Sequence, residues 1–146
     1  MTTAQDPTTQ EKNKAVLRKL AEAFTNHDVK AFEEIYSPNV VYHGTGDLAS
    51  ADRKTFVDFA AQFMKAFPDG RVTVDDLLAA DDKVAYCMTV TGTHEVEFMG
   101  IPATNKQVTI RAIGIARVSG GHIVEEWENF DDLGMLQQLG VMSDHP

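Results

Sequence analysis

Two adjacent aspartates, Asp131 and Asp132, stand where a β-rich segment gives way to a short apolar helical pattern. A carboxylate at such a junction has three open roles: a helix cap, a solvated charge, or the acid/base group of an enclosed pocket. Burial in an apolar cavity raises the pKa of a carboxyl group toward neutrality, where it can both take and give a proton. A helix N-terminus acts the other way, because its dipole favours the charged form. We expect a division of labour, with Asp132 as the cap and Asp131 facing the cavity.

The residues before the aspartates suggest what would surround them. If the segment is a regular strand, Trp127 and Asn129 share a face with Asp131. The opposite face then carries Glu126, Glu128 and Phe130. Trp127 and Asn129 are therefore predicted to line the pocket, although core packing is the alternative for Trp127. A bulge in the strand would exchange the two faces and bring in Glu128.

Two histidines, His43 and His94, each end a predicted strand. Imidazole titrates near neutral pH, so either can polarise a carbonyl or relay a proton; the alternative is a hydrogen-bonded residue at the pocket rim. With Asp131 they also have the composition of a two-histidine, one-carboxylate metal site. No local spacing supports such a site, and we expect neither a metal nor a cofactor.

Four more side chains are candidates for substrate contacts. Arg111 interrupts an apolar strand, VTIRAIGIARV, so its guanidinium either anchors an anionic group or pairs with an acid at the surface or an interface. Tyr42 can donate a hydroxyl hydrogen bond, and Phe63 and Met88 can line an apolar pocket. Each of these three has core packing as its alternative.

Hydrophobic periodicity predicts the elements that position these residues. Apolar residues at helical spacing predict helices over residues 8–24, 31–35 and 52–67. Strands are predicted over 40–43, 71–78, 83–93, 106–118 and 122–130, followed by a short helix that carries Leu133, Leu136 and Leu139. The connections are short, so neighbouring strands should be antiparallel. The sequence therefore predicts an α+β fold, with a strongly curved antiparallel sheet packed against three N-terminal helices and a cavity between the layers.

Composition limits the classes of function. The 146 residues suit one domain over residues 8–146, after a frayed segment at 1–7. A formal charge of −9 opposes nucleic-acid binding, and no apolar run is long enough to cross a membrane. Cys87 is the single cysteine, which excludes an intramolecular disulfide, and no export signal is visible, so a cytoplasmic location is expected.

Two long segments carry a family resemblance. The segment GTHEVEFMGIPATNKQV, which begins at Gly92, and GGHIVEEWENFDDLGMLQQLG, which begins at Gly120, resemble the SnoaL-like polyketide (ester) cyclases of the NTF2-like superfamily. The sequence departs from the family pattern at residues 95–97, at Asn105 and at 119–122, which affects the expected pocket rim and substrate more than the fold.

The resemblance implies a cone-shaped α+β barrel with a deep pocket, and a homo-oligomer, dimer or tetramer, formed through the outer face of the sheet. It also implies ring closure by intramolecular aldol condensation, without metal or cofactor, with an aspartate as general acid/base. By position in W-x-x-x-D-x-L-G, that aspartate is Asp131.

Together these observations predict a cofactor-independent acid/base enzyme that acts on a hydrophobic, carbonyl-rich small molecule. Its expected catalytic residues are Asp131, His94 and His43, and its expected substrate contacts are Trp127, Asn129, Arg111, Tyr42, Phe63 and Met88. One alternative is a hydrolase, hydratase or isomerase of the same superfamily, in which Asp131 activates water with Asn129 and Arg111. The other is a non-catalytic binding or scaffold module, for which both aspartates should point outward and side chains should fill the cone.

Overall fold

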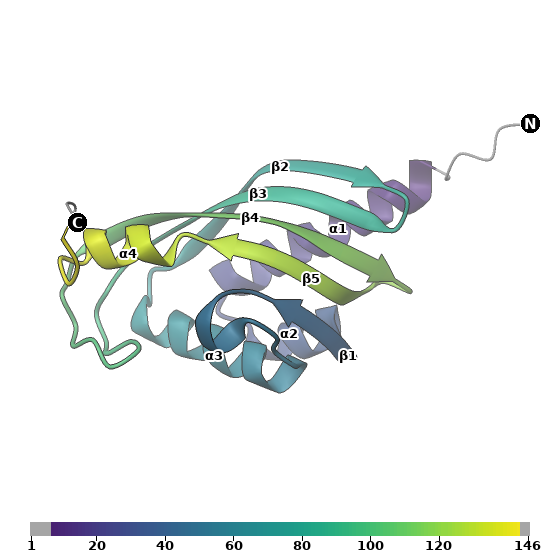
Figure 1. The fold of residues 1–146 in the computed structure, drawn as a ribbon. Helices are drawn as coiled ribbons and strands as arrows, with labels where there is room; N and C mark the ends of the chain where they lie inside the picture. Colours follow the sequence, from purple (N-terminus) through teal and green to yellow (C-terminus); the bar gives the residue numbers. More distant parts are fainter. Residues whose placement is uncertain (1–6, 144–146) are drawn as a thin grey trace, which may run out of the picture.

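A computed structural model describes residues 7–143 as helices packed on one five-stranded sheet (Figure 1). The elements in chain order are α1 (Pro7–Thr25), α2 (Val29–Ile35), β1 (Tyr36–His43), a short 3₁₀ helix η1 (Gly46–Leu48), α3 (Arg53–Ala66), β2 (Arg71–Ala80), β3 (Lys83–Thr93), β4 (Gln107–Ser119), β5 (His122–Phe130) and α4 (Asp132–Gln138). Residues 1–6 of the expected frayed segment lie outside the described residues. Its last residue, Pro7, is the first residue of α1. No helix in the described part is long and apolar enough to span a membrane.

Aspartate side chains cap the starts of two helices. The Asp28 carboxylate accepts a hydrogen bond from the Ala31 N–H and caps α2, and Asp52 caps α3 in the same way through the Thr55 N–H. The first strand differs from prediction, because β1 starts at Tyr36 and runs through Pro38. Proline is tolerated there because β1 is an edge strand, where a missing N–H leaves no neighbour unpaired.

The strand order is β1-β5-β4-β3-β2. The three pairs formed by consecutive strands from β2 to β5 are antiparallel, as predicted. β1 instead pairs in parallel with β5, which sets Tyr42 opposite Glu126 and His43 opposite Trp127. The sheet is curved and open, with β1 and β2 at its edges.

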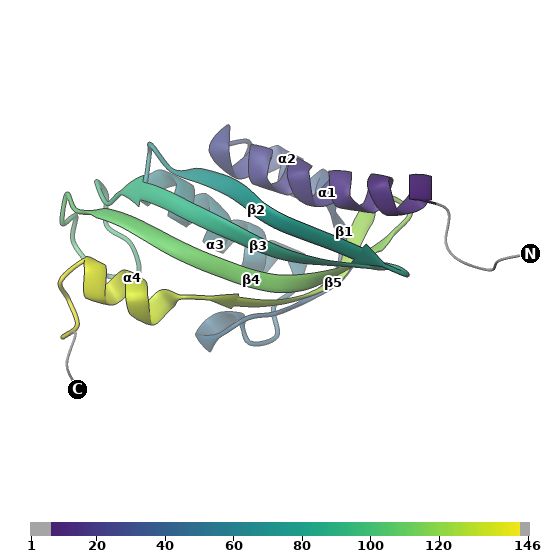
Figure 2. The same ribbon diagram turned by 90° about the horizontal axis from the view of Figure 1, so that it is seen from above.

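The two faces of the sheet have different surroundings. Helices α1, α2 and α3 cover the inner face, as Figure 1 shows, and in Figure 2 the strands pass in front of α3. On the inner face, β4 presents the small residues Ala112, Gly114 and Ala116. Long side chains from its neighbours cross over them: a Cβ added at Gly114 would lie 2.4 Å from the Tyr86 hydroxyl oxygen.

The space between the sheet and the helices is filled by side chains. Aromatic rings of α2, α3 and β1 pack against one another there, including Phe56 against Tyr36 and Tyr42 with ring centroids 5.0 and 4.4 Å apart. The small hollow found between α1, α3 and the β2–β3 hairpin has a volume of about 10 Å³. The two layers therefore pack closely at these positions, which differs from the large cavity predicted between them.

Candidate active site

Two carboxylates on the inner face of β5 lie in the core. Glu126 is 1% exposed, and Glu128 is partly buried two residues further along the strand. Within residues 7–143, no lysine, arginine or histidine forms an ion pair with either of them. Burying a carboxylate without a cation is costly unless hydrogen bonds satisfy its oxygens.

Three tyrosine hydroxyls supply those hydrogen bonds. Tyr36 donates to Glu126 Oε1 at 2.6 Å, and Tyr42 donates to Glu128 Oε1. The Tyr86 hydroxyl lies between the two acids, in contact with Glu126 Oε2 and 2.8 Å from Glu128 Oε2. All three tyrosines are at least 97% buried. We call these five residues the carboxylate–tyrosine cluster.

The cluster changes the acid–base behaviour of its members. Burial raises the pKa of Glu126 to about 8, with a further increase from the negative charge of Glu128, although hydrogen bonds from Tyr36 and Tyr86 oppose the shift. Burial also raises the pKa of Glu128, against the effect of the Tyr42 and Tyr86 hydroxyls. The tyrosine pKa values are raised as well, first by burial and then by the acids. A carboxyl group with a pKa near 8 can take or give a proton at neutral pH.

A sizeable hollow lies on the opposite, outer face of the sheet. It is an open groove of about 530 Å³, which is within the range of small-molecule sites. Its lining residues are His43, Gly44, Asp76, Leu78, Ala85, Tyr86, Cys87, Ile113, Gly114, Ile115, Trp127, Glu128 and Asn129. Two of them, Ile113 and Ile115, leave 52% and 42% of their surface exposed in the single chain.

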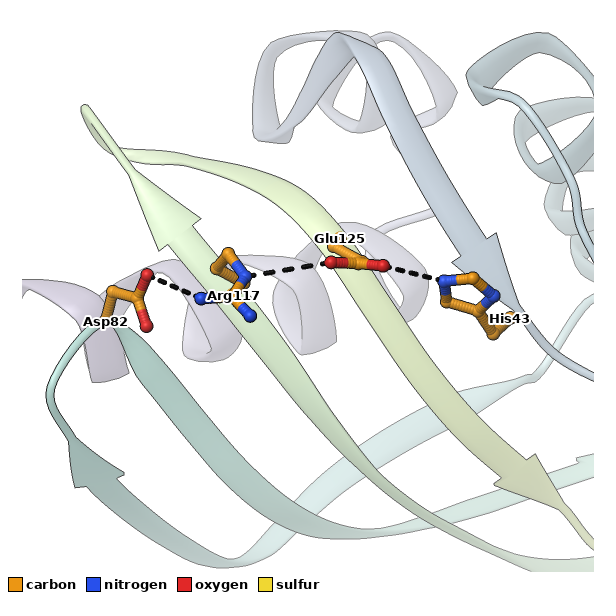
Figure 3. A network of polar contacts seen from close by, with 4 residues as sticks. All are labelled: His43, Asp82, Arg117 and Glu125. Atoms are coloured by element: carbon orange, nitrogen blue, oxygen red, sulfur yellow. Dashed lines mark hydrogen bonds and ion pairs between the residues drawn. The ribbon is translucent and has the colours of Figure 1, made fainter.

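An aromatic platform stands at one side of this groove. The His43 and Trp127 rings stack with centroids 5.3 Å apart. Figure 3 shows what holds the imidazole: Glu125 contacts His43 Nε2 at 2.8 Å and faces Arg117 Nε at 3.7 Å, while Arg117 also binds Asp82 at 2.8 Å. These pairs are partly exposed, so they orient the ring more than they stabilise the fold.

The groove and the cluster meet at one point in the sheet. Tyr86, Gly114 and Glu128 line the groove, and they are direct neighbours across β3, β4 and β5. Because Gly114 has no side chain, the Tyr86 ring can cross the β4 backbone and reach the acids on β5. Glu128 is therefore the acid of the cluster that is also among the lining residues of the groove, while its carboxylate binds Tyr42 and Tyr86 on the inner face.

Comparison with known proteins agrees with this architecture. The family model for SnoaL-like polyketide cyclases matches residues 14–139. The chain belongs to this family. A search of curated proteins gives no significant match.

Solved structures of SnoaL-like proteins superpose on most of the chain. IdmH from Streptomyces antibioticus, named as a candidate polyketide cyclase, is 33% identical with a TM-score of 0.76, over 88% of this chain and 98% of IdmH. AclR from Streptomyces galilaeus, named as a candidate hydroxylase, is 28% identical with a TM-score of 0.84, over 94% and 86% of the two chains. An LEH-like epoxide hydrolase from M. tuberculosis is 14% identical with a TM-score of 0.70, over 91% and 92%, and shares the fold alone.

The predicted cap of α4 is wrong, because Asp131 and not Asp132 is the N-cap in this SnoaL-like chain, and the acid/base role of Asp131 stays a prediction. Asp131 is the N-cap of α4: its carboxylate accepts from the Gly134 N–H at 2.9 Å and is exposed. Asp132 is exposed too and accepts from the Thr45 hydroxyl at 3.2 Å. The physical reason is local, because the first turn of α4 offers unpaired N–H groups and the Asp131 side chain is placed to bind one.

The alternation of side chains predicted for β5 is confirmed, but the face predicted to line an interior pocket is the outer face of the sheet. Trp127 and Asn129 do share a face, and with His43 they line the outer groove rather than an interior pocket. Tyr42 lies on the inner face, where its hydroxyl binds Glu128. The structure thus brings three of the predicted residues together on the outer face and places Tyr42 in the buried cluster.

The other predicted site residues lie apart from both the groove and the cluster. His94 is fully buried; its Nδ1 lies 3.2 Å from the Thr104 N–H, and its Nε2 has no partner among the described residues. Phe63 packs in an apolar cluster with Phe67, and Met88 lies in the main core. Arg111 is exposed on the outer face and forms no ion pair within residues 7–143, and its roles as an anchor for an anionic group or as a partner of an interface acid stay predictions.

Sequence reasoning missed Glu126, Tyr36 and Tyr86 as members of one site. Two glutamates at alternate positions of a strand, with aromatic residues in the other strands, were the available signal. Its meaning depends on β1 pairing with β5, which no local pattern encodes. Within the described residues, no three metal-binding side chains are grouped to hold an ion.

Replacing Asp131 separates its capping role from a role in proton transfer. Asp131→Ala should lower the free energy of unfolding by about 1 kcal/mol, because a Gly134 N–H loses its partner. Asp131→Asn should change it little, since the amide oxygen can still cap. Urea unfolding measures both values, and equal losses in the two variants would contradict the capping role.

The Glu126 carboxyl should make stability fall as the pH rises. Its pKa is raised from 4.5 to about 8 on folding, so in this window the folded chain holds a proton that the unfolded chain has released. Its contribution is full below pH 4.5 and is lost as the pH rises through about 8, at up to about 1.4 kcal/mol per pH unit. Urea unfolding of wild type and Glu126→Gln at several pH values should show a shallower decline for the variant. Glu97→Gln, the same change on an exposed loop, should follow the wild type; parallel curves for all three proteins would contradict the prediction.

Proposed function

We propose that this chain is a cofactor-independent acid/base enzyme that closes a ring in a hydrophobic, carbonyl-rich small molecule by intramolecular aldol condensation. Membership of the SnoaL-like family supports the class of enzyme. The observation that carries the proposal is the position of Glu128, which lines a groove of about 530 Å³ and belongs to a buried cluster with raised carboxyl pKa values. This assignment replaces Asp131, whose carboxylate caps α4.

The proposed reaction needs only proton transfers and one new bond. A base removes a proton from the carbon beside one carbonyl, and the resulting enolate carbon attacks a second carbonyl carbon of the same molecule. A carbon–carbon bond forms, and the oxygen of the attacked carbonyl takes up a proton, so no oxidant or reductant is consumed. Glu128 is the proposed acid/base group, and Glu126, at 1% exposure, acts through it.

The remaining groove residues supply apolar and aromatic surface for such a substrate. Ile113, Ile115 and Leu78 are exposed apolar side chains, and the stacked His43–Trp127 platform can pack against a planar conjugated system. Glu125 accepts the Nε2–H of His43, so Nδ1 of the neutral ring is an acceptor that can bind an enol hydroxyl of a bound molecule. A hydrophobic substrate and a cytoplasmic location stay predictions from the sequence.

We also propose that a second copy of the chain covers the outer face. Ile113, Ile115, Leu78 and Val41 expose 39–68% of their surface there, and charged residues such as Glu125 stand beside them. An apolar centre with a polar rim is the usual composition of a protein interface. A copy placed over the open groove would shield it from water and strengthen the electrostatic interactions inside.

The second candidate function is a non-catalytic binding or scaffold module. Two observations favour it: Asp131 and Asp132 are both exposed, and side chains fill the space between the sheet and the helices. Under this alternative the carboxylate–tyrosine cluster serves stability and specificity of the fold.

Proton exchange on carbon distinguishes the two functions without knowledge of the natural substrate. Wild type should speed the exchange of α-protons for deuterium in a panel of aryl β-diketones and β-keto esters, followed by NMR in D₂O. Glu128→Gln should lose about 100-fold or more of this rate, because the amide cannot take the proton. Asp131→Asn is the matched control and should keep the rate. A wild-type rate equal to that of buffer would favour the non-catalytic module.

The oligomer can be tested by one substitution on the outer face. Wild type should have the mass of two or more chains in light scattering, and Ile113→Glu should have the mass of one chain, because a buried charge without a partner opposes association. Leu133→Glu makes the same change at an exposed position of α4, 52% exposed, and should leave the mass unchanged. A single-chain mass for the wild type would refute the interface.

A further inference from the structure

The contacts of the carboxylate–tyrosine cluster permit a count of its protons. Four oxygen–oxygen contacts join the two acids to the three hydroxyls: Tyr36 with Glu126, Tyr86 with Glu126, Tyr86 with Glu128, and Tyr42 with Glu128. Each carboxylate oxygen takes part in one contact. Every hydrogen bond needs its own proton between the two oxygens.

The hydroxyls supply three protons for these four contacts. Tyr36 and Tyr42 each use theirs on one acid, and Tyr86 can give its single proton to only one of its two acidic neighbours. An ionised carboxylate only accepts, so the remaining contact would set two oxygen lone pairs against each other at hydrogen-bond distance. The contact is satisfied if the acid in it carries a proton and donates to the Tyr86 oxygen.

We propose that the Glu126–Glu128 pair holds one proton, shared through the Tyr86 hydroxyl, so that one glutamate is a carboxylic acid while the other is a carboxylate. In one arrangement, Glu128 donates to the Tyr86 oxygen and Tyr86 donates to Glu126. In the other, both hydrogen bonds are reversed. The exchange breaks one O–H bond on an acid and one on Tyr86 and forms the same two bonds on the opposite sides, so the total charge of the cluster stays at −1.

The surroundings favour a single charge. The groups that shift the pKa of Glu126 are Glu128 and the Tyr36 and Tyr86 hydroxyls, together with burial itself. From the packed elements, α3 contributes the Phe56 ring against Tyr36 and Tyr42, and the neighbouring positions of β4 are alanine and glycine. With no cation paired to either acid in the described residues, two full charges would repel each other in a medium of low polarity.

The shared proton gives the proposed enzyme a stored proton that Glu128 can receive from Glu126. Glu126 cannot meet a substrate, but a proton on Glu126 can pass to Glu128 at the groove by the reversal of two hydrogen bonds. The role of the proton in turnover rests on the proposed function, whereas its presence in the cluster does not.

Carbon NMR of protein labelled at the glutamate carboxyl carbon tests the proton count without substrate. Glu126→Gln and Glu128→Gln assign the two signals, each by the loss of one. At about pH 7 the two wild-type signals should together report one protonated and one ionised carboxyl, and both should reach the ionised position when the pH passes well above 8. Two ionised or two protonated signals at pH 7 would overturn the proposal.

Two conservative variants should move the proton in opposite directions. Tyr36→Phe removes a donor from Glu126, so the Glu126 signal should shift toward the protonated position and the Glu128 signal toward the ionised position. Tyr42→Phe should do the reverse. Shifts of both signals in the same direction, or no shift in a variant whose circular dichroism shows a folded chain, would also overturn the proposal. Turnover without these NMR signals would contradict the shared proton but not the proposed function. The NMR signals without turnover would contradict the proposed function but not the shared proton.

Discussion

The hydrogen bonds to the two buried acids of β5 are the constraint on which the rest of the structure depends. Glu126 and Glu128 lie in the core without a paired cation among the described residues, so hydroxyls must reach all four of their oxygens. β1 and β3 provide those hydroxyls from either side. This requires β1 beside β5, and it requires Gly114 on β4, because any larger residue would collide with the Tyr86 hydroxyl. The pairing of β1 with β5 and the glycine at position 114 are therefore both needed for this one polar cluster.

The sheet separates two environments that an acid/base enzyme needs. Its inner face excludes water and raises carboxyl pKa values, while its outer face offers an open apolar groove beside the His43–Trp127 platform. Glu128 takes part in both. The arrangement also explains why the outer face carries exposed isoleucines in an otherwise acidic chain, since a surface of that kind suits a bound molecule or a second copy.

The C-terminal motif of the SnoaL-like family has a local physical basis in this chain. Asp131 folds its carboxylate over Gly134, where an added Cβ would lie 2.3 Å from its Oδ2. The aspartate and the glycine therefore form one capping unit that starts α4, and Met135 and Leu139 of this segment are then buried against the sheet. In this chain the motif starts a helix, and the position of a residue in a motif does not by itself assign a proton-transfer role.

The sequence by itself determined the α+β class, the order of the elements, most of their ends, and the alternation that puts Trp127 and Asn129 on one face of β5 and the glutamates on the other. These features follow from local periodicity, caps and turns. The sequence did not determine which face is buried or how β1 joins the sheet. Both depend on contacts between residues about 85 positions apart, such as Tyr42 with Glu128, where |i−j| is 86. Only tertiary structure decided that the helices cover the glutamate face, because burying Tyr36, Tyr42 and Tyr86 there also satisfies the acids.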